Sequence, residues 1–177
     1  MMTWFLLATS CLLFAPVDCG GWVNDWNQKA QRNCSNGSFL SNIDSEHNND
    51  YEDRRFRMSC RSLPVSGGTA SCVWTSILNS WDDDVGHQCP DGGYVGGMTS
   101  YHDNHHEDRR YRLYCCNLSG HYTYGCYTTD YVNNYDETFM FSVPNNLVLG
   151  GMKSVHRNWN EDRKFKFIIC GMKSINQ

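Results

Sequence analysis

The sequence lacks an excess of positive charge, a second long apolar segment and the short motifs of common enzymes. Fifteen Lys and Arg residues stand against nineteen Asp and Glu residues, which gives a formal net charge of −4. Because binding to a phosphate backbone requires clustered positive charge, nucleic acid is not expected as the main partner. The chain contains no nucleophile elbow, P-loop, dinucleotide fingerprint or zinc-protease motif. We therefore expect a protein that is not an enzyme and needs no cofactor.

One long apolar run is present, from Trp4 to Val17. It has the length of a signal-peptide core and is too short to cross a bilayer as a helix. We therefore expect residues 1–19 to be a signal peptide that is removed. Residues 20–177 would then form a single secreted domain without a membrane span.

The cysteines predict an oxidising compartment. Without Cys11 and Cys19 of the predicted signal peptide, eight cysteines remain, and an even set in an exported chain predicts four disulfides. No Cys-x-x-Cys motif is present to suggest metal binding or redox activity. Two N-glycosylation sequons, at Asn36 and Asn117, agree with a location in the extracellular space or matrix.

The predicted domain consists of three copies of one unit of about 54 residues. At offsets of 55 and then 54 residues, three closely similar strings that begin Glu-Asp-Arg align, at residues 52–57, 107–112 and 161–166. A fixed period of this length means that each unit buries its apolar face against its neighbours. We expect the repeats to span about 20–61, 62–116 and 117–177.

Apolar and polar residues alternate with period two after each Asp-Arg pair. Phe56, Met58 and Cys60 would face the core, while Arg55 and Arg57 would face solvent. Each of these strands is expected to pair with a short apolar strand upstream across a long polar tip, which makes a hairpin. The upstream strands are residues 39–45, 94–100 and 148–154. This pattern predicts an all-β, disulfide-stapled fold in a pseudo-threefold arrangement, β-prism-like or β-trefoil-like, because closure protects strand edges.

The repeat also predicts the cysteine pairing. Cys34–Cys60 and Cys89–Cys115 are equivalent pairs with a spacing of 26 residues, and Cys72–Cys116 and Cys126–Cys170 are equivalent pairs with a spacing of 44 residues. In the third repeat, Val143 and Ile169 occupy the positions of the first kind of pair. Neighbouring residues of a strand point to opposite faces, so Cys115 and Cys116 can serve two different bridges.

These strings resemble the dermatopontin family across essentially the whole predicted mature chain. The resemblance is carried by the Asp-Arg-x-aromatic-x-apolar-x-Cys strings, the Cys115-Cys116 doublet, the Gly-Trp-Val-Asn start at residues 21–24 and the Cys-Val-Trp segment at residues 72–74. It implies an extracellular matrix protein that binds proteoglycans, promotes collagen fibril assembly and supports cell adhesion. Its invertebrate members include lectin-like proteins that agglutinate blood cells. The chain lacks the Tyr-rich acidic N-terminal extension and one cysteine pair of the vertebrate pattern, which favours an invertebrate-type function.

A polar pattern, Ser-x-His-x-Asn-x-x-Glu-Asp-Arg, recurs in every repeat near the predicted hairpin tip. We interpret it as a site for sugar hydroxyls, because these side chains offer both hydrogen-bond donors and acceptors. Three copies would make binding multivalent and raise avidity. The alternative is that the same residues hold each hairpin through turn and cross-strand hydrogen bonds. The candidates are His47, Asn49, Asp53 and Arg54; His102, Asn104, Asp108 and Arg109; and His156, Asn158, Asp162 and Arg163.

Two basic residues face outward on the Asp-Arg strand of every repeat. They could contact sulfated glycosaminoglycan through their positive charge. The alternative is that they are solvated strand residues balanced by nearby acids, such as those at residues 82–84. The basic-face candidates are Arg55 and Arg57, Arg110 and Arg112, and Lys164 and Lys166.

The aromatic residues are candidates for stacking on sugar rings. Trp26, Trp81 and Tyr135 recur in register, and we expect them to form a layer of the core. Trp159 lies in a predicted polar tip and is expected to be exposed. The predicted tip at residues 102–106 is rich in His and Asp, the ligand types of zinc sites. Its spacing matches no standard site, so we expect a polar loop and no metal.

Three functions are compatible with these features. The leading hypothesis is a secreted matrix or adhesion protein that binds glycans or proteoglycans, with collagen or cell-surface receptors as further partners and homo-oligomerisation left open. The alternative is a soluble lectin-like agglutinin in host defence or cell aggregation. A purely structural matrix component is the third hypothesis. Polar sites in triplicate favour binding over catalysis, which rarely uses three equal sites.

Overall fold

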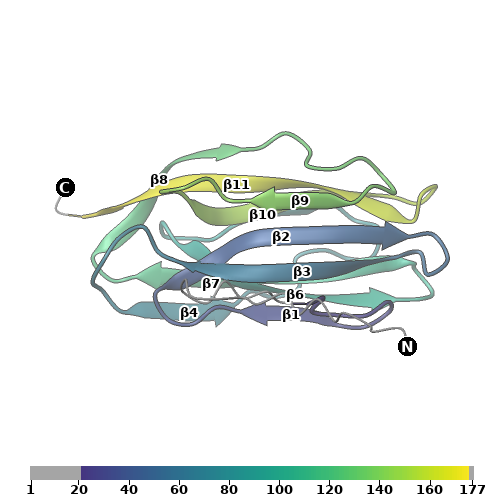
Figure 1. Ribbon diagram of the computed structural model, residues 1–177, viewed down its shortest axis with the longest axis horizontal. Coiled ribbons are helices and arrows are strands. Elements are labelled where there is room, and N and C mark those ends of the chain that lie inside the picture. Colours follow the sequence, from purple (N-terminus) through teal and green to yellow (C-terminus); the bar gives the residue numbers. More distant parts are fainter. Residues whose placement is uncertain (1–20, 176–177) are drawn as a thin grey trace, which may run out of the picture.

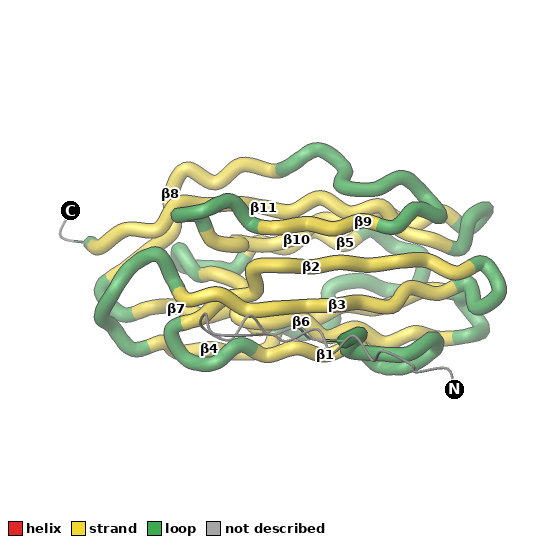
Figure 2. Tube along the Cα trace, in the orientation of Figure 1, coloured by secondary structure: helices red, strands yellow, loops and turns green. Residues whose placement is uncertain are grey.

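A computed structural model describes residues 21–175, and this part of the chain is all-β (Figure 1, Figure 2). The predicted signal peptide, with Cys11 and Cys19, lies outside the described residues. The strands are β1 Ala30–Asn33, β2 Ser38–Asn48, β3 Asp53–Ser62, β4 Ala70–Trp74, β5 Val85–Gln88, β6 Tyr94–Asp103, β7 Asp108–Leu118, β8 His121–Thr128, β9 Phe139–Ser142, β10 Val148–Arg157 and β11 Asp162–Ser174. Between residues 21 and 175 there is no helix suited to cross a membrane.

The strands form three antiparallel sheets, each built on one long hairpin. Their strand orders are β1-β6-β7-β4, β5-β10-β11-β8 and β3-β2-β9. In each sheet, a short strand from the preceding repeat pairs with the first strand of the hairpin: β1 with β6, β5 with β10, and β9 of the third repeat with β2 of the first. The repeats are therefore joined by exchanged strands.

The three predicted hairpins are confirmed, and their strands are longer than expected. The paired strands continue to Asn48–Asp53, Asp103–Asp108 and Arg157–Asp162. Only the turns at residues 49–52, 104–107 and 158–161 separate them, rather than long polar tips. The three turns lie at one end of the molecule (Figure 1). His47, His102 and His156 consequently lie on strands.

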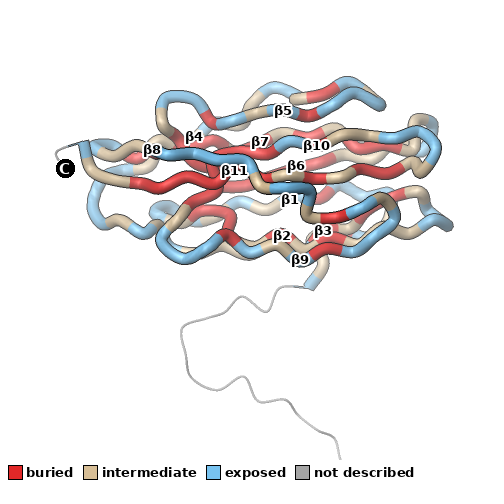
Figure 3. The backbone as a smooth tube through the Cα atoms, turned by 90° about the horizontal axis from the view of Figure 1, so that it is seen from above, coloured by how far each residue is buried: buried red, intermediate tan, exposed pale blue. Residues whose placement is uncertain are grey.

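One core is shared by the three sheets, and its buried residues run along the central strands (Figure 3). The first aromatic residue after each Asp-Arg pair is buried: Phe56, Tyr111 and Phe165. The three rings contact one another edge to face, with centroids 6.0–6.5 Å apart. Such aromatic contacts contribute roughly 0.5–1.5 kcal/mol each beyond area burial. The rings therefore join the three hairpins at the centre of the core.

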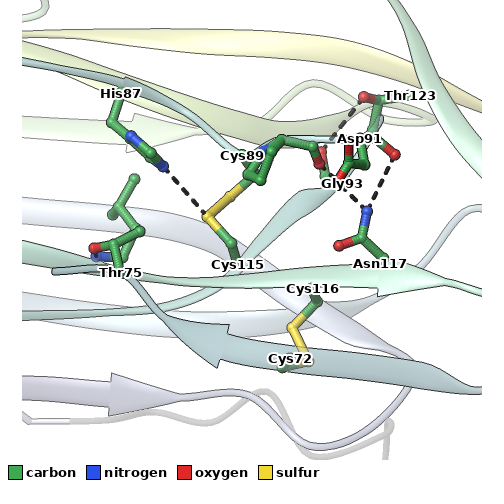
Figure 4. Close-up of a disulfide and its surroundings, with 12 residues drawn as sticks. Cys72, Thr75, His87, Cys89, Asp91, Gly93, Cys115, Cys116, Asn117 and Thr123 are labelled. Carbon is green, nitrogen blue, oxygen red and sulfur yellow. Dashed lines mark hydrogen bonds between the residues drawn. A yellow bond between two sulfur atoms is a disulfide. The ribbon is translucent and has the colours of Figure 1, made fainter.

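Four disulfides link the same cysteines as the repeat spacing predicts: Cys34–Cys60, Cys72–Cys116, Cys89–Cys115 and Cys126–Cys170. Figure 4 shows Cys115 and Cys116 projecting to opposite sides of β7. Cys116 bonds to the directly opposite residue of the neighbouring strand β4. In the third repeat Val143 and Ile169 are both buried in the core.

A β-bulge interrupts each hairpin at the same position of the repeat. The register shifts lie at Ser41, Gly96 and Gly150. A Cβ atom on Gly96 or Gly150 would lie 2.5 Å from the sulfur of Cys116 or Cys170, respectively. The first repeat has Arg61 in place of these cysteines and tolerates Ser41. The disulfide therefore explains why glycine is required at two of the three bulges.

Candidate functional site

The Asp-Arg residues form three buried ion pairs between repeats. Arg109 donates from Nε and one terminal nitrogen to the carboxylate of Asp53, at 2.6 and 2.8 Å. Arg163 binds Asp108 at 2.6 and 2.7 Å, and Arg54 binds Asp162 at 2.6 and 2.8 Å. The arginine of the second repeat thus binds the aspartate of the first, that of the third binds the second, and that of the first binds the third. The three ion pairs therefore close a cycle.

Most of the remaining polar atoms of the ion-pair cycle also have partners, but Arg163 Nη1 and Ser154 Oγ of the third repeat have none among the described residues. The backbone N–H groups of Asn27, Asp82 and Asp136 donate to the three carboxylates. The second terminal nitrogen of Arg54 and of Arg109 faces Ser45 and Ser100, the serines of the recurring pattern. All six Asp and Arg side chains are at most 3% exposed. These buried, hydrogen-bonded ion pairs hold neighbouring repeats together.

The ion pairs shift the pKa of the buried carboxyls. Burial alone would raise the pKa of Asp53, but the contacts with His102 and Arg109 outweigh it and lower the pKa to about 2. For Asp162, burial is likewise outweighed by His47 and Arg54, and the pKa falls to about 2. A low folded-state pKa means that the ionised carboxylate stabilises the fold.

A buried histidine accompanies each ion pair, with its side chain at most 1% exposed. A ring nitrogen of His102 lies 3.0 Å from Asp53 and another lies 3.4 Å from Glu107. His47 lies between Asp162 and Glu52, and His156 between Asp108 and Glu161. None of the six ring nitrogens has hydrogen-bond geometry to a described partner.

Three glutamates complete the cluster at the turns. Glu52, Glu107 and Glu161 have φ angles of 44°, 43° and 42°, which is the left-handed region. A non-glycine residue in this region is strained, and such strain recurs at functional sites. With the His, Asp and Arg side chains, the glutamates line a pocket of about 10 Å³, enough for about one water molecule. A sugar ring does not fit into this pocket.

The outward basic residues lie over aromatic rings on all three repeats. We call these surfaces the basic-aromatic ladders: Arg55 and Arg57 with Trp22 and Trp26, Arg110 and Arg112 with Trp81 and Trp74, and Lys164 and Lys166 with Tyr131 and Tyr135. The cations lie 4.1–5.9 Å from the ring centroids. Trp26, Trp81 and Tyr135 are half-buried ladder members and not a core layer, because the outward cations hold their rings on the surface.

The turn residues are separate from the ion-pair cycle. Asn49, Asn104 and Asn158 are exposed, unlike the buried His, Asp and Arg side chains of the same sequence pattern. Trp159 is 89% exposed, which confirms the expectation for this residue. At the second turn, His106 Nδ1 donates to the carboxylate of Asp103 at 2.8 Å, and the His106 ring stacks on Trp81.

The sequence interpretation missed Asn24, Asn79 and Asn133. These residues recur in register, and each precedes a ladder residue, Trp26, Trp81 or Tyr135, by two positions in the chain. Their side-chain oxygens accept from the backbone N–H of Phe56, Tyr111 and Phe165. Their amide nitrogens donate to the carbonyls of Arg54, Arg109 and Arg163. They fix the backbone at the point where the Asp-Arg pair enters the core. The sequence signal that could have identified these three asparagines is their recurrence at the repeat offsets of 55 and 54 residues.

Comparison with known proteins identifies the family of this chain. The family model of dermatopontin matches residues 24–174. The chain belongs to the dermatopontin family. The match covers all three hairpins of this dermatopontin-family protein together with the ion-pair cycle and every ladder residue except Trp22.

Several curated relatives of this dermatopontin-family chain are similar over most of its length. It is 38% identical over 156 residues to the hemagglutinin/amebocyte aggregation factor of Limulus polyphemus, covering 86% of this chain and 88% of the relative. It is 38% identical over 148 residues to Millepora cytotoxin-1 of Millepora dichotoma, covering 84% and 65%. Identity to the dermatopontin of Biomphalaria glabrata is 30% over 149 residues, covering 84% and 99%. None of these names is that of an enzyme. No solved structure matches the chain.

Proposed function

We propose that this protein is a secreted, non-catalytic matrix or adhesion protein that binds glycans or proteoglycans. The supporting observation is the basic-aromatic ladder on each of the three repeats. A sulfated glycan offers anionic groups to the cations and apolar sugar faces to the rings. Three separate ladders would bind one long chain, or several chains, with raised avidity.

The proposal extends to the turns. Asn49, Asn104 and Asn158 offer exposed amides, and Trp159 offers an exposed ring. The buried candidates, which are the His, Asp and Arg residues of the recurring pattern, would act by holding the turns and ladders in place. A glycan would then contact the ladder and turn of one repeat without entering the ion-pair cycle.

A soluble agglutinin is the second candidate. The 38% identity to a protein named hemagglutinin/amebocyte aggregation factor favours it. Agglutination requires at least two binding surfaces on one particle, and the ladders would supply them. A purely structural matrix component would bind no glycan at these surfaces.

The arrangement and processing of the chain belong to the same proposal. The closed cycle of ion pairs and exchanged strands supports three repeats placed around a pseudo-threefold axis. Removal of residues 1–19 would release the domain of residues 20–177.

Of the two sequons, Asn36 is exposed. The side-chain nitrogen of Asn117 donates to the carbonyls of Pro90 and Asp91 (Figure 4), so a glycan there, which replaces one of the two N–H hydrogens, would remove at least one of these bonds.

Heparin chromatography with matched variants tests the ladders. We expect the double variant Arg110→Ser and Arg112→Ser to elute at clearly lower salt than wild type. The control is Lys29→Ser with Lys153→Ser, which removes the same charge from exposed positions outside the ladders. If both variants lose the same retention, or wild type is not retained, glycosaminoglycan binding through the ladders is wrong.

Haemagglutination with sugar competition separates the two candidates. Agglutination that a free sugar blocks supports the agglutinin, and heparin retention without agglutination supports the matrix role. Asn104→Ala tests the turn, and we expect weaker glycan binding with an unchanged thermal midpoint. Absence of both activities supports the structural component and contradicts the proposal.

A further inference from the structure

We propose that Asp82, Asp108 and His156 form a site for one divalent transition-metal ion between the second and third repeats. One ligand atom from each residue lies within 4.8 Å of the other two. Asp82 is exposed, whereas Asp108 and the His156 side chain are 1% exposed. The site is therefore open to solvent on one side and has a buried floor.

His156 is the observation that points to a ligand. Its ring is buried, and neither ring nitrogen has a hydrogen-bond partner among the described residues. Nδ1 lies 3.6 Å from Asp82 Oδ1 and Nε2 lies 3.8 Å from Asp108 Oδ1, which is too far for a hydrogen bond. An unpaired buried imidazole costs free energy, and a metal ion held between the ring and the carboxylates removes that cost.

Asp108 keeps a lone pair for a metal ion although it is part of the ion-pair cycle. Its Oδ2 accepts from Arg163 and from the backbone N–H of Asp82, at 2.7 and 2.9 Å. Its Oδ1 accepts only from Arg163 Nε among the described donors, at 2.6 Å. A carboxylate has about four lone-pair sites, so Oδ1 has one left and it is this atom that faces His156.

The local charge favours a cation. Asp82, Asp108 and Glu161 surround His156, and of these three carboxylates Arg163 pairs with Asp108. Such carboxylates repel one another unless a proton or a metal ion neutralises them.

The equivalent positions in the other repeats differ in a way that the site explains. Asn27 replaces Asp82 beside Asp53 and His102, so the carboxylate of Asp82 has no counterpart there. Asp136 stands beside Asp162 and His47, but its Oδ2 accepts from Asn160 at 2.8 Å. Within residues 21–175, the three-ligand geometry is met only at Asp82, Asp108 and His156.

Two carboxylates and one imidazole are a ligand set for Zn²⁺ and similar ions, with water or Glu161 completing the coordination. Ca²⁺ prefers a shell of oxygen ligands, so it is expected to bind more weakly. A bound ion would cross-link the second and third repeats beside an ion pair that already joins them.

Titration calorimetry of the folded, disulfide-bonded protein with Zn²⁺ tests the site. Wild type is expected to bind one equivalent, and Asp82→Asn to bind roughly tenfold more weakly or worse. Asp82→Asn copies Asn27 of the first repeat and should therefore fold. His156→Gln removes the imidazole, and its thermal midpoint without metal checks folding. Excess Zn²⁺ should raise the thermal midpoint of wild type clearly more than that of Asp82→Asn.

The control variant is His105→Ala, at an exposed histidine of the second turn. We expect it to bind Zn²⁺ as wild type does. Binding lost in His105→Ala but kept in Asp82→Asn would place the ion at the turn and overturn the proposal. Absence of saturable Zn²⁺ binding by wild type, or stronger binding of Ca²⁺ than of Zn²⁺, would overturn it as well.

Discussion

At the residue scale, the Glu-Asp-Arg string assigns a different task to each side chain. Glu lines the pocket at the turn, Asp receives the guanidinium of the next repeat, and Arg reaches the carboxylate of the preceding repeat. Each guanidinium also lies 5.8–5.9 Å from a ring of the central aromatic trio. The Asp and Arg residues can be buried here because each of these charges has a bidentate partner.

Burial predicts which arginines matter for stability. Arg54→Met should lower the free energy of unfolding by about 3–5 kcal/mol, because Asp162 would remain buried without its partner. Arg55→Met should cost about 1 kcal/mol or less, because Arg55 and Glu46 are each 28% exposed. Denaturant unfolding with disulfides intact measures both. Equal losses would show that Arg54 is not in a buried pair.

Acid should destabilise the protein through Asp53 and Asp162. Their folded-state pKa of about 2 lies below the ordinary aspartate pKa of 3.8, so their contribution to stability is complete above about pH 4. It is lost as the pH falls from about 4 to about 2, and each carboxyl contributes about 2 kcal/mol. Denaturant midpoints across this range should fall steeply for wild type and less steeply for Asp53→Asn. The same slope in both would contradict the assignment.

At the element scale, every hairpin has a bulge, and in the second and third repeats the bulge makes room for a disulfide. The sulfur of Cys116 lies where a side chain on Gly96 would begin. The bulge of the first repeat contains Ser41 because no cysteine faces it. The sequence difference between the bulges therefore follows from the disulfide difference between the repeats.

Gly96→Ala should cost about 1–3 kcal/mol through overpacking against the Cys72–Cys116 disulfide. The cost should shrink when the same change is made together with Cys72→Ala and Cys116→Ala, because the two sites are in contact. Gly86→Ala on β5 is the control, since nothing lies within 4 Å of the added Cβ. Thermal unfolding measures all variants, and an unchanged cost without the disulfide would refute the explanation.

The hairpins could be predicted from the sequence because alternation and repeat offsets are local patterns. The ion-pair partners could not, since Arg54 and Asp162 lie 108 residues apart and Arg109 and Asp53 lie 56 apart. Neighbours such as Asp53 and Arg54 suggest a local pair, yet adjacent strand residues point to opposite faces. The outward position of Trp26 was missed because a register reveals recurrence and not the face of the sheet.

At the scale of the whole molecule, each repeat is incomplete without its neighbours. The hairpin of every repeat pairs with a strand from another repeat, and its aspartate binds an arginine from another repeat. Its central aromatic ring packs against the rings of the other repeats. Most of the stabilising contacts are thus between segments far apart in the chain, which predicts slow folding relative to a helical protein of this size. Buried residues form the interfaces between the repeats. The ladders and turns therefore remain on the surface, where a partner can reach them.

The central claim is that the buried Asp-Arg pairs join different repeats, and a double-mutant cycle tests it most directly. The free energy of unfolding is measured for Asp53→Asn, Arg109→Met and both together, beside a second cycle with Asp53→Asn and Arg54→Met. We predict a coupling of about 1–3 kcal/mol for Asp53 with Arg109 and near zero for Asp53 with Arg54. Strong coupling to Arg54, with none to Arg109, would contradict the account.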